Sequence, residues 1–300
     1  MNHITNATMH NVQHRSVKPS ERSVKKIVAG VKTSDGDGVK LTRIIGSSQL
    51  DMLDPFLLLD CFESDQAEDY IGGFPTHPHR GFETVTYLLN GKMRHKDSAG
   101  NEGVIEPGGV QWMTAGKGIL HSEMPEQEDG LLKGFQLWVN LPSHAKMNEP
   151  QYQEFLPDSM ACEQLTNGGQ INVIAGTTNQ GTTGAVKNVH SEPLYLDVHL
   201  SAGQVLTQSI TLNHNAFIYV IEGEVTVQSE QSNTAIEALK LAVLTNGEQV
   251  SLQSGVEGSR FLLIAGKPFN EPIARHGPFV MNTRDQLLQA FDDFNQGKFA

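Results

Sequence analysis

The chain has 300 residues and a mass of 32.8 kDa, a length that corresponds to about two domains of ordinary size. Hydrophobic residues make up 38% and charged residues 19%, a composition that excludes a disordered chain, a coiled coil and a collagen-like repeat. The 22 Lys and Arg against 34 Asp and Glu leave a net charge of −12, which disfavours direct binding to nucleic acid.

Residues 1–25 are polar and include several basic side chains, such as Arg15 and Arg22. They lack the apolar stretch of a secretory signal, so we expect a solvated N-terminal arm, with a transit peptide as the alternative. The chain has no apolar run of the roughly 18 residues that a membrane-spanning helix needs. Its two cysteines, Cys61 and Cys162, are too few for a disulfide framework and fit a reducing compartment. We therefore predict a cytoplasmic protein without membrane contact.

Most of the chain is predicted to form β-strands. Short apolar or alternating runs recur between turns rich in Gly, Pro, Asn and Asp, and helical periodicity is scarce before the last segment. The predicted strands include Lys40–Ile45, Phe56–Leu59, Thr84–Leu89, Gly134–Leu141, Leu194–Leu200, Phe217–Ile221 and Phe261–Ile264. Turns such as Asn90-Gly91 and Asn246-Gly247 lie between such runs. This spacing predicts an all-β sandwich or barrel.

The last segment is the exception and is predicted to form a short helix. Thr283 and Gln286 have the spacing of a capping box, and Gly297 is a helix-ending residue. Leu287, Phe291 and Phe294 share one helical face. We expect this helix to serve packing rather than chemistry.

A weak internal repeat predicts two β-domains of one kind in tandem. Tyr87-Leu-Leu-Asn-Gly91 recurs as Tyr219-Val-Ile-Glu-Gly223, an offset of 132 residues. Phe135-Gln-Leu-Trp-Val-Asn-Leu-Pro142 has a fainter echo in Phe261-Leu-Leu-Ile-Ala-Gly-Lys-Pro268, an offset of 126. A cluster of Pro, Asn and Gly between Pro150 and Gly169 marks the junction. The predicted parts are the arm (1–25), an N-terminal metal-binding domain (26–155), a second domain (156–282) and the helix (283–300).

Two pairs of metal-ligand residues stand about forty residues apart in the first predicted domain. His77-Pro-His79 places two imidazoles at i and i+2, which is one face of a strand. His121-Ser-Glu123 repeats this spacing with an imidazole and a carboxylate. If both strands line one barrel, the four groups converge and suit iron, manganese, nickel, copper or zinc. Four protein ligands on an octahedral ion leave two positions open, which is typical of a catalytic site.

The repeat predicts that the second domain holds no metal. An offset of 132 carries His77 and His79 to Ser209 and Thr211, and His121 to Gln253, which form no comparable ligand set. The second domain is therefore expected to be structural or to close the pocket. The other histidines considered lack a partner at ligand spacing and are expected to be surface or hydrogen-bonded residues: His95, His144, His190, His199, His214 and His276.

Long motifs around these residues resemble those of the pirin family, from about Lys26 to the C-terminus. The matching segments are Gly72-Gly-Phe-Pro-Thr-His77-Pro-His79-Arg-Gly-Phe-Glu83-Thr-Val-Thr-Tyr87, Gln111-Trp-Met-Thr-Ala-Gly-Lys-Gly-Ile-Leu-His121-Ser-Glu123-Met-Pro125, Phe135-Gln-Leu-Trp-Val-Asn-Leu-Pro142 and Gly277-Pro-Phe-Val-Met-Asn282.

The resemblance implies an all-β bicupin, with two tandem antiparallel β-barrels of jelly-roll type, face to face, and a short C-terminal helix. It implies one metal in the N-terminal barrel, bound by His77, His79, His121 and Glu123. Many other cupins use the glutamate of the first motif, so Glu83 is the alternative ligand or a group that orients an imidazole. The implied metal is Fe(II), with Mn, Ni, Co, Cu and Zn as alternatives.

The resemblance also implies two competing functions. The first is a quercetin 2,3-dioxygenase-type activity on a planar, chelating enol substrate and dioxygen, releasing carbon monoxide and an ester. In it Glu123 takes the substrate's hydroxyl proton. The second is a redox-responsive regulator that contacts a protein partner near Arg80, without essential turnover.

Four further residues are expected at the substrate pocket because of their positions. Phe74 and Arg80 flank the histidine pair, and Gln136 and Trp138 share one face of a neighbouring strand. Packing roles are the alternative for each of them. The absence of a basic loop or exposed apolar patch favours the enzyme over the regulator. A third hypothesis is that the protein is a structural bicupin that binds no metal.

Overall fold

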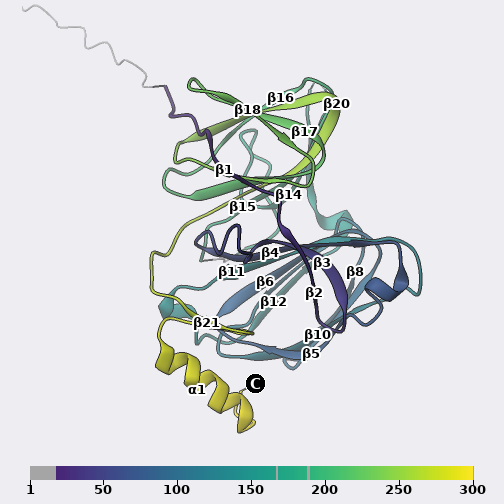
Figure 1. Ribbon diagram of the computed structural model, residues 1–300, viewed down its shortest axis with the longest axis vertical. Helices are drawn as coiled ribbons and strands as arrows, with labels where there is room; N and C mark the ends of the chain where they lie inside the picture. The colour runs from purple at the N-terminus through teal and green to yellow at the C-terminus, as the bar shows by residue number, and fades with distance from the viewer. Residues whose placement is uncertain (1–17, 167, 188–189, 300) are drawn as a thin grey trace, which may run out of the picture.

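The computed structural model describes residues 18–166, 168–187 and 190–299 (Figure 1). Most of the predicted N-terminal arm, residues 1–17, therefore lies outside the described residues. The described chain forms two stacked β-halves, with the helix α1 (Arg284–Asn295) below the lower one in Figure 1. None of the described helices is long and apolar enough to cross a membrane.

The first half contains a seven-stranded and a four-stranded antiparallel sheet. The larger sheet, in the order β12-β9-β6-β11-β4-β3-β2, consists of β2 (Val31–Asp35), β3 (Val39–Ile45), β4 (Phe56–Ser64), β6 (Phe82–Asn90), β9 (Val110–Thr114), β11 (Leu132–Asn140) and β12 (Gln151–Phe155). The smaller sheet, in the order β5-β10-β7-β8, consists of β5 (Phe74–His79), β7 (Met93–Asp97), β8 (Glu102–Ile105) and β10 (Ile119–Pro125).

The second half is one nine-stranded sheet built around two long strands. Its strands are β1 (Val24–Val28), β13 (Ala161–Gln164), β14 (Gly169–Ala175), β15 (Leu194–Leu200), β16 (Val205–Ser209), β17 (Asn215–Gln228), β18 (Asn233–Glu237), β19 (Leu241–Leu244) and β20 (Gln249–Gly266). The remaining elements are the hairpin strands β21 (Ala274–His276) and β22 (Phe279–Met281) and the short 3₁₀ turns η1 (Ala67–Asp69), η2 (Ser143–Ala145) and η3 (Pro157–Ser159).

The all-β architecture with a C-terminal helix is confirmed, but hydrogen bonding among the described residues does not close either half into a complete barrel. In the first half β6 stops at Asn90, and Gly91, with φ +83°, turns the chain into β7 of the other sheet. In the second half β17 passes through the equivalent bend at Gly223, with φ +73° and register shifts on both sides. Such shifts bend a strand without ending it. The repeated Tyr-to-Gly motif therefore marks the same bend twice.

The fainter of the two repeated motifs, at Phe135 and Phe261, is one residue out of register in the structure. Phe135 pairs with Tyr87, whereas the residue opposite Tyr219 is Leu262, not Phe261. Successive strand residues point to opposite faces, so a slip of one residue changes the face. Phe135 accordingly packs between the halves, while Phe261 packs inside the second half.

A shared apolar core joins the two halves face to face. Aromatic side chains of both meet edge to face, with ring centroids 5.3 Å apart for Phe56 and Phe217 and 5.4 Å apart for Phe135 and Tyr219. The Tyr87 hydroxyl donates a 2.6 Å hydrogen bond across the interface to the fully buried Asp197 carboxylate. Burial alone would raise the pKa of Asp197, but hydrogen bonds from His199 and Arg260 outweigh it and hold the pKa below its usual range.

The two ends of the chain cross between the halves. Strand β1 pairs with β19 of the second half, although the rest of the early chain builds the first half. Conversely, β22 contacts the first half through an Arg80–Phe279 pairing. The chain passes from the first sheet to the second between Phe155 and Ala161. The predicted domain boundaries stay predictions, and these crossings show that each end supports the half remote from it in sequence.

Candidate metal centre and pocket

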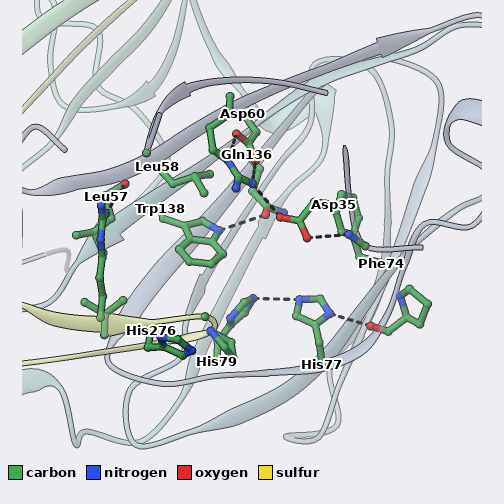
Figure 2. A pocket seen from close by; sticks show the side chains of 18 residues that line it. Asp35, Leu57, Leu58, Asp60, Phe74, His77, His79, Gln136, Trp138 and His276 are labelled. Carbon is green, nitrogen blue, oxygen red and sulfur yellow. Dashed lines mark hydrogen bonds and ion pairs between the residues drawn. The ribbon is translucent and has the colours of Figure 1, made fainter. Parts of the chain in front are cut away.

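Three histidines from two adjacent strands converge in the first half. His77 lies directly opposite His121 in the β5–β10 ladder, and His79 lies two residues along β5 on the same face. The Nε2 atoms of His77 and His79 are 3.0 Å apart (Figure 2). One ligand nitrogen from each of the three rings lies within 4.8 Å of the others. The sequence prediction that these imidazoles converge is therefore confirmed.

The hydrogen bonding of the three rings fits a bound metal ion. The carbonyl of Pro75 accepts a 2.8 Å bond from His77 Nδ1, which leaves Nε2 of a neutral ring unprotonated. Both nitrogens of His121 and Nδ1 of His79 are buried without a partner among the described residues. Burial, and then the neighbouring imidazoles, lowers the pKa of His79 and His121 well below the usual value. Neutral imidazoles with free lone pairs are the form that binds metals.

Glu123 is buried beside this cluster, but its carboxylate is held from the opposite sheet. Thr86 Oγ1 and Gln136 Nε2 each donate a 2.7 Å hydrogen bond, one to each carboxylate oxygen. The group of converging ligand atoms in the described residues consists of the three histidines, without Glu123. The fourth ligand therefore stays a prediction, and the structure shows which residues fix this carboxylate.

Glu83 lies on the other face of β6 and is separate from the histidines. It follows the alternation of Val85 and Tyr87, which pack between the halves, whereas Thr86 faces Glu123. Thr114 Oγ1 donates a 2.7 Å bond to Glu83, and burial raises the pKa of Glu83 to about 7. The alternative role of Glu83 as a ligand or imidazole-orienting group is not supported by this geometry.

His95 is part of the surroundings of the centre, which its isolated position in the sequence did not indicate. Its ring is buried 5.3 Å from the ring of His121 and stacks on Tyr152 with a centroid distance of 4.7 Å. Asp97 accepts a 3.2 Å bond from His95 Nε2. His95 thus packs against the His121 ring, and Tyr152 and Asp97 in turn hold His95 in place.

A pocket of about 780 Å³ opens beside His77 and His79 between the two sheets of the first half. Three of the four expected pocket residues line it, namely Phe74, Gln136 and Trp138. Figure 2 shows the histidines on one side of the pocket and Gln136, Asp60 and Leu58 on the other. Aromatic and aliphatic walls with a few polar groups are typical of small-molecule sites.

A hydrogen-bonded chain links this pocket to Glu123. The indole Nε1 of Trp138 donates a 3.2 Å bond to Gln136 Oε1, and Gln136 in turn donates to Glu123. The Trp138 ring also meets His79 edge to face at 5.2 Å. Trp138 and Gln136 therefore connect the pocket wall both to the histidine cluster and to the carboxylate.

Arg80 is buried outside the pocket lining, and its side chain anchors the C-terminal segment. It donates a 2.7 Å hydrogen bond to Asp293 of α1, lies 4.4 Å from the centre of the Phe299 ring, and contacts the carbonyl of Lys117. A bend of the chain directly after His79 thus holds the helix. The capping box of Thr283 and Gln286 forms as predicted and starts that helix.

The hairpin β21–β22 closes one side of the pocket. Arg275, His276, Pro278 and Val280 are among the lining residues. The buried amine of Lys146 fixes this hairpin by donating hydrogen bonds to the carbonyls of Gly81 and Val280. His276 is exposed, as predicted for a surface histidine, and it also lies in the pocket lining, which the sequence did not indicate.

Two charged residues of the facing wall were also absent from the sequence prediction. Arg43 and Asp60 form a bidentate ion pair with distances of 3.0 and 2.7 Å, and both line the pocket. The available signal was the i, i+2 spacing of Leu58 and Asp60 in an otherwise apolar strand. It did not show that the pair faces a cavity.

The corresponding strands of the second half carry no histidine pair. In β16 and β20, Thr207 lies opposite Ser251 and Val205 opposite Gln253. Within the described ranges, the histidine cluster of the first half accounts for every group of convergent metal-ligand side chains. That the second half holds no metal stays a prediction.

Comparison with known proteins assigns the chain to a family. Residues 38–139 match the Pirin family model, and residues 195–300 match that of the pirin C-terminal cupin domain. A pirin-like protein of Caulobacter vibrioides is 54% identical over 93% of this chain and 99% of its own length. Human pirin is 43% identical over 93% of this chain and 94% of its own.

A solved structure gives the same assignment. The quercetin 2,3-dioxygenase of Acinetobacter baumannii is 36% identical, with a TM-score of 0.84 over 94% of this chain and 99% of that one. The fold, the two matched domains and the histidine motifs agree, and the chain belongs to the pirin family.

Proposed function

We propose that this protein is a metal-dependent dioxygenase that opens the ring of quercetin-like flavonols or a related chelating enol. The observation that carries the proposal is the convergence of three histidine side chains, two of which, His77 and His79, line an aromatic pocket. The name of the similar Acinetobacter baumannii structure supports the same reaction class.

His77, His79, His121 and Glu123 would hold the ion, with Fe(II) as the proposed metal. This set of nitrogen and oxygen ligands suits a borderline divalent transition metal. When bound, such an ion lowers the pKa of a coordinated hydroxyl group and brings substrate and dioxygen together. The overall reaction consumes one dioxygen and releases carbon monoxide and an ester.

The protein's own residues position the substrate and move one proton. Phe74 and Trp138 offer aromatic surface to a planar molecule. Glu123 accepts the proton of the substrate's enolic hydroxyl group, which makes the adjoining carbon electron-rich. Because Thr86 and Gln136 hold its two oxygens, the Glu123 carboxylate is oriented before the substrate arrives.

Oxygen consumption tests the proposal directly. Protein loaded anaerobically with Fe(II) is mixed with quercetin and oxygen, and uptake is compared with that of His121→Ala and Glu123→Gln. We expect turnover in the unaltered chain and its loss in both variants. His144→Ala is the matched control, because its ring contacts His190 rather than the centre.

Stoichiometric iron without oxygen uptake would overturn the dioxygenase proposal. The regulatory function would then be tested by partner capture under reducing and oxidising conditions, with His79→Ala as the control that lacks the intact centre.

A further inference from the structure

We infer that the Arg43–Asp60 pair is a specificity-determining element of the pocket, which recognises phenolic hydroxyl groups on the part of the substrate remote from the histidines. The inference rests on the proposed function and names the substrate class more closely. The class is a planar enol whose second ring is uncharged and hydroxylated.

The two residues occupy the wall that faces the histidine cluster. Asp60 lies opposite Gln136 in the β4–β11 ladder, and Arg43 lies opposite Asp60 in the β3–β4 ladder. Leu58 is two residues from Asp60 in β4, on the same face, and lies opposite Trp138. In Figure 2 Asp60 and Gln136 are on one side of the pocket and His77 and His79 on the other, with Trp138 between them.

The pair keeps hydrogen-bonding capacity that the protein does not use. Each Asp60 oxygen accepts one bond from Arg43 and has a second lone pair. Among the described residues, Nη1 of Arg43 has no hydrogen-bond partner, because Nε and Nη2 serve Asp60 and Asp35. A hydroxyl group, which both donates and accepts, satisfies the two kinds of group at once.

The charge of this wall selects against acids. Arg43 contacts two carboxylates, Asp35 at 2.8 Å and Asp60 at 2.7 Å, so the three residues together carry one negative charge. Arg275, also in the lining, is occupied by Asp51 and the carbonyl of Leu57. A carboxylated ring would meet net repulsion here, whereas a neutral phenol would not.

The second half offers a matched control. Arg260 also forms a bidentate pair with a buried aspartate, Asp197, at 3.1 and 2.8 Å. The exposed fractions of the two arginine side chains are similar, 25% for Arg43 and 21% for Arg260. Arg260 lies outside the pocket lining, so its replacement reports the cost of losing such a pair without touching the substrate.

The test compares the affinities of two flavonols under anaerobic conditions, where no turnover occurs. Quercetin carries hydroxyl groups on both ring systems, and 3-hydroxyflavone carries only the enolic one. Binding to the full-length Fe(II)-loaded protein is followed through quenching of tryptophan fluorescence, since Trp138 lines the pocket. Both Kd values are measured for the unaltered chain, Arg43→Gln, Arg43→Lys, Asp60→Asn and Arg260→Gln.

We expect quercetin to bind more tightly than 3-hydroxyflavone. The Kd of 3-hydroxyflavone divided by the Kd of quercetin should fall about tenfold in the Arg43 and Asp60 variants. Arg260→Gln should leave the ratio unchanged. An unchanged ratio in Arg43→Lys and Asp60→Asn, both checked for cooperative unfolding, would overturn the inference. So would an equal fall in Arg260→Gln.

The outcome separates this inference from the proposed function. If the ratio changes as expected but no oxygen is consumed, recognition by Arg43 and Asp60 stands and the dioxygenase proposal fails. If neither flavonol binds, both are overturned.

Discussion

The two halves of this protein use one strand plan for different interiors. Inside the second half the sheet surrounds a continuous apolar core, of which Leu196, Val198 and Leu252 are members. Inside the first half, apolar clusters lie around a polar middle formed by the histidines, Glu123 and the side chains that hold it. The same fold is therefore compatible with a filled core or with a site.

The difference also has an energetic side. Buried nitrogens of His121 and His79 in the first half have no partner among the described residues, which costs free energy until a ligand satisfies them. The second half instead contributes Asp197, whose carboxylate is satisfied by Arg260, Asn172 and Tyr87. The comparison indicates that the second half, through Asp197, stabilises the contact between the two halves.

The largest effect on stability is expected when the carboxylate of Asp197, which connects the two halves, is removed. Asp197→Ala leaves the Arg260 guanidinium and the Tyr87 hydroxyl without their acceptor, so we expect a loss of about 3 to 5 kcal/mol in the free energy of unfolding. Urea titration measures it. A loss below about 1 kcal/mol would contradict the stabilising role assigned to the second half.

The same carboxylate predicts how stability depends on pH. Because the folded-state pKa of Asp197 is depressed, its contribution is present above the ordinary carboxyl pKa of about 4 and is lost as the pH falls further. Asp197→Asn should therefore flatten the decline in stability below about pH 4. If the free energy of unfolding declines equally in Asp197→Asn below about pH 4, other carboxylates cause that decline.

Substitution of a histidine tests the other side of the comparison. His79→Ala should lower the affinity for Fe(II) by more than about 100-fold, since even residues behind a metal ligand are often worth 10- to 100-fold. Metal content after dialysis, measured by atomic emission, checks this. His199→Ala in the second half is the control and should retain the metal; near-stoichiometric iron in His79→Ala would contradict the site.

The two bends allow a comparison at equivalent positions. Gly223→Ala adds a Cβ 2.2 Å from the carbonyl oxygen of Gly258 at φ +73°, so we expect a loss of about 3 kcal/mol. Gly91→Ala meets first the flexible end of Gln127, so we expect about 1 kcal/mol. Urea titrations of both variants measure the difference. Equal losses would show that the long strand is no more tightly constrained than the broken one.

The smallest expected effect concerns the helix that crosses back to the first half. Asp293→Asn removes one charge from the pair with Arg80 and should cost about 1 kcal/mol, with the Phe299 contact retained. Thermal unfolding measures the loss, and Asp292→Asn, one residue earlier on α1, is the matched control. An equal loss in both variants would mean that the Arg80 contact contributes nothing specific.

The sequence predicted the elements whose signals are local. Strands such as Leu194–Leu200 and the capping box at Thr283 were found because alternation and caps act over a few residues. His77, His79 and His121 were found because two i, i+2 pairs require no more than neighbouring strands. The resemblance to the pirin motifs then identified the two segments that carry these histidines.

Contacts between distant segments were decided by the tertiary structure alone. No local pattern shows that β1 completes the second half, that Arg80 holds α1, or that the β21–β22 hairpin lines the same pocket as β5, because each case brings together residues far apart in sequence. The face of Phe261 was likewise decided by strand pairing, because Tyr219 lies opposite Leu262 and Phe261 therefore points to the other face. The pocket belongs to this second class: its histidine wall follows from the sequence, whereas Arg43 and Asp60 face it only because two sheets pack together.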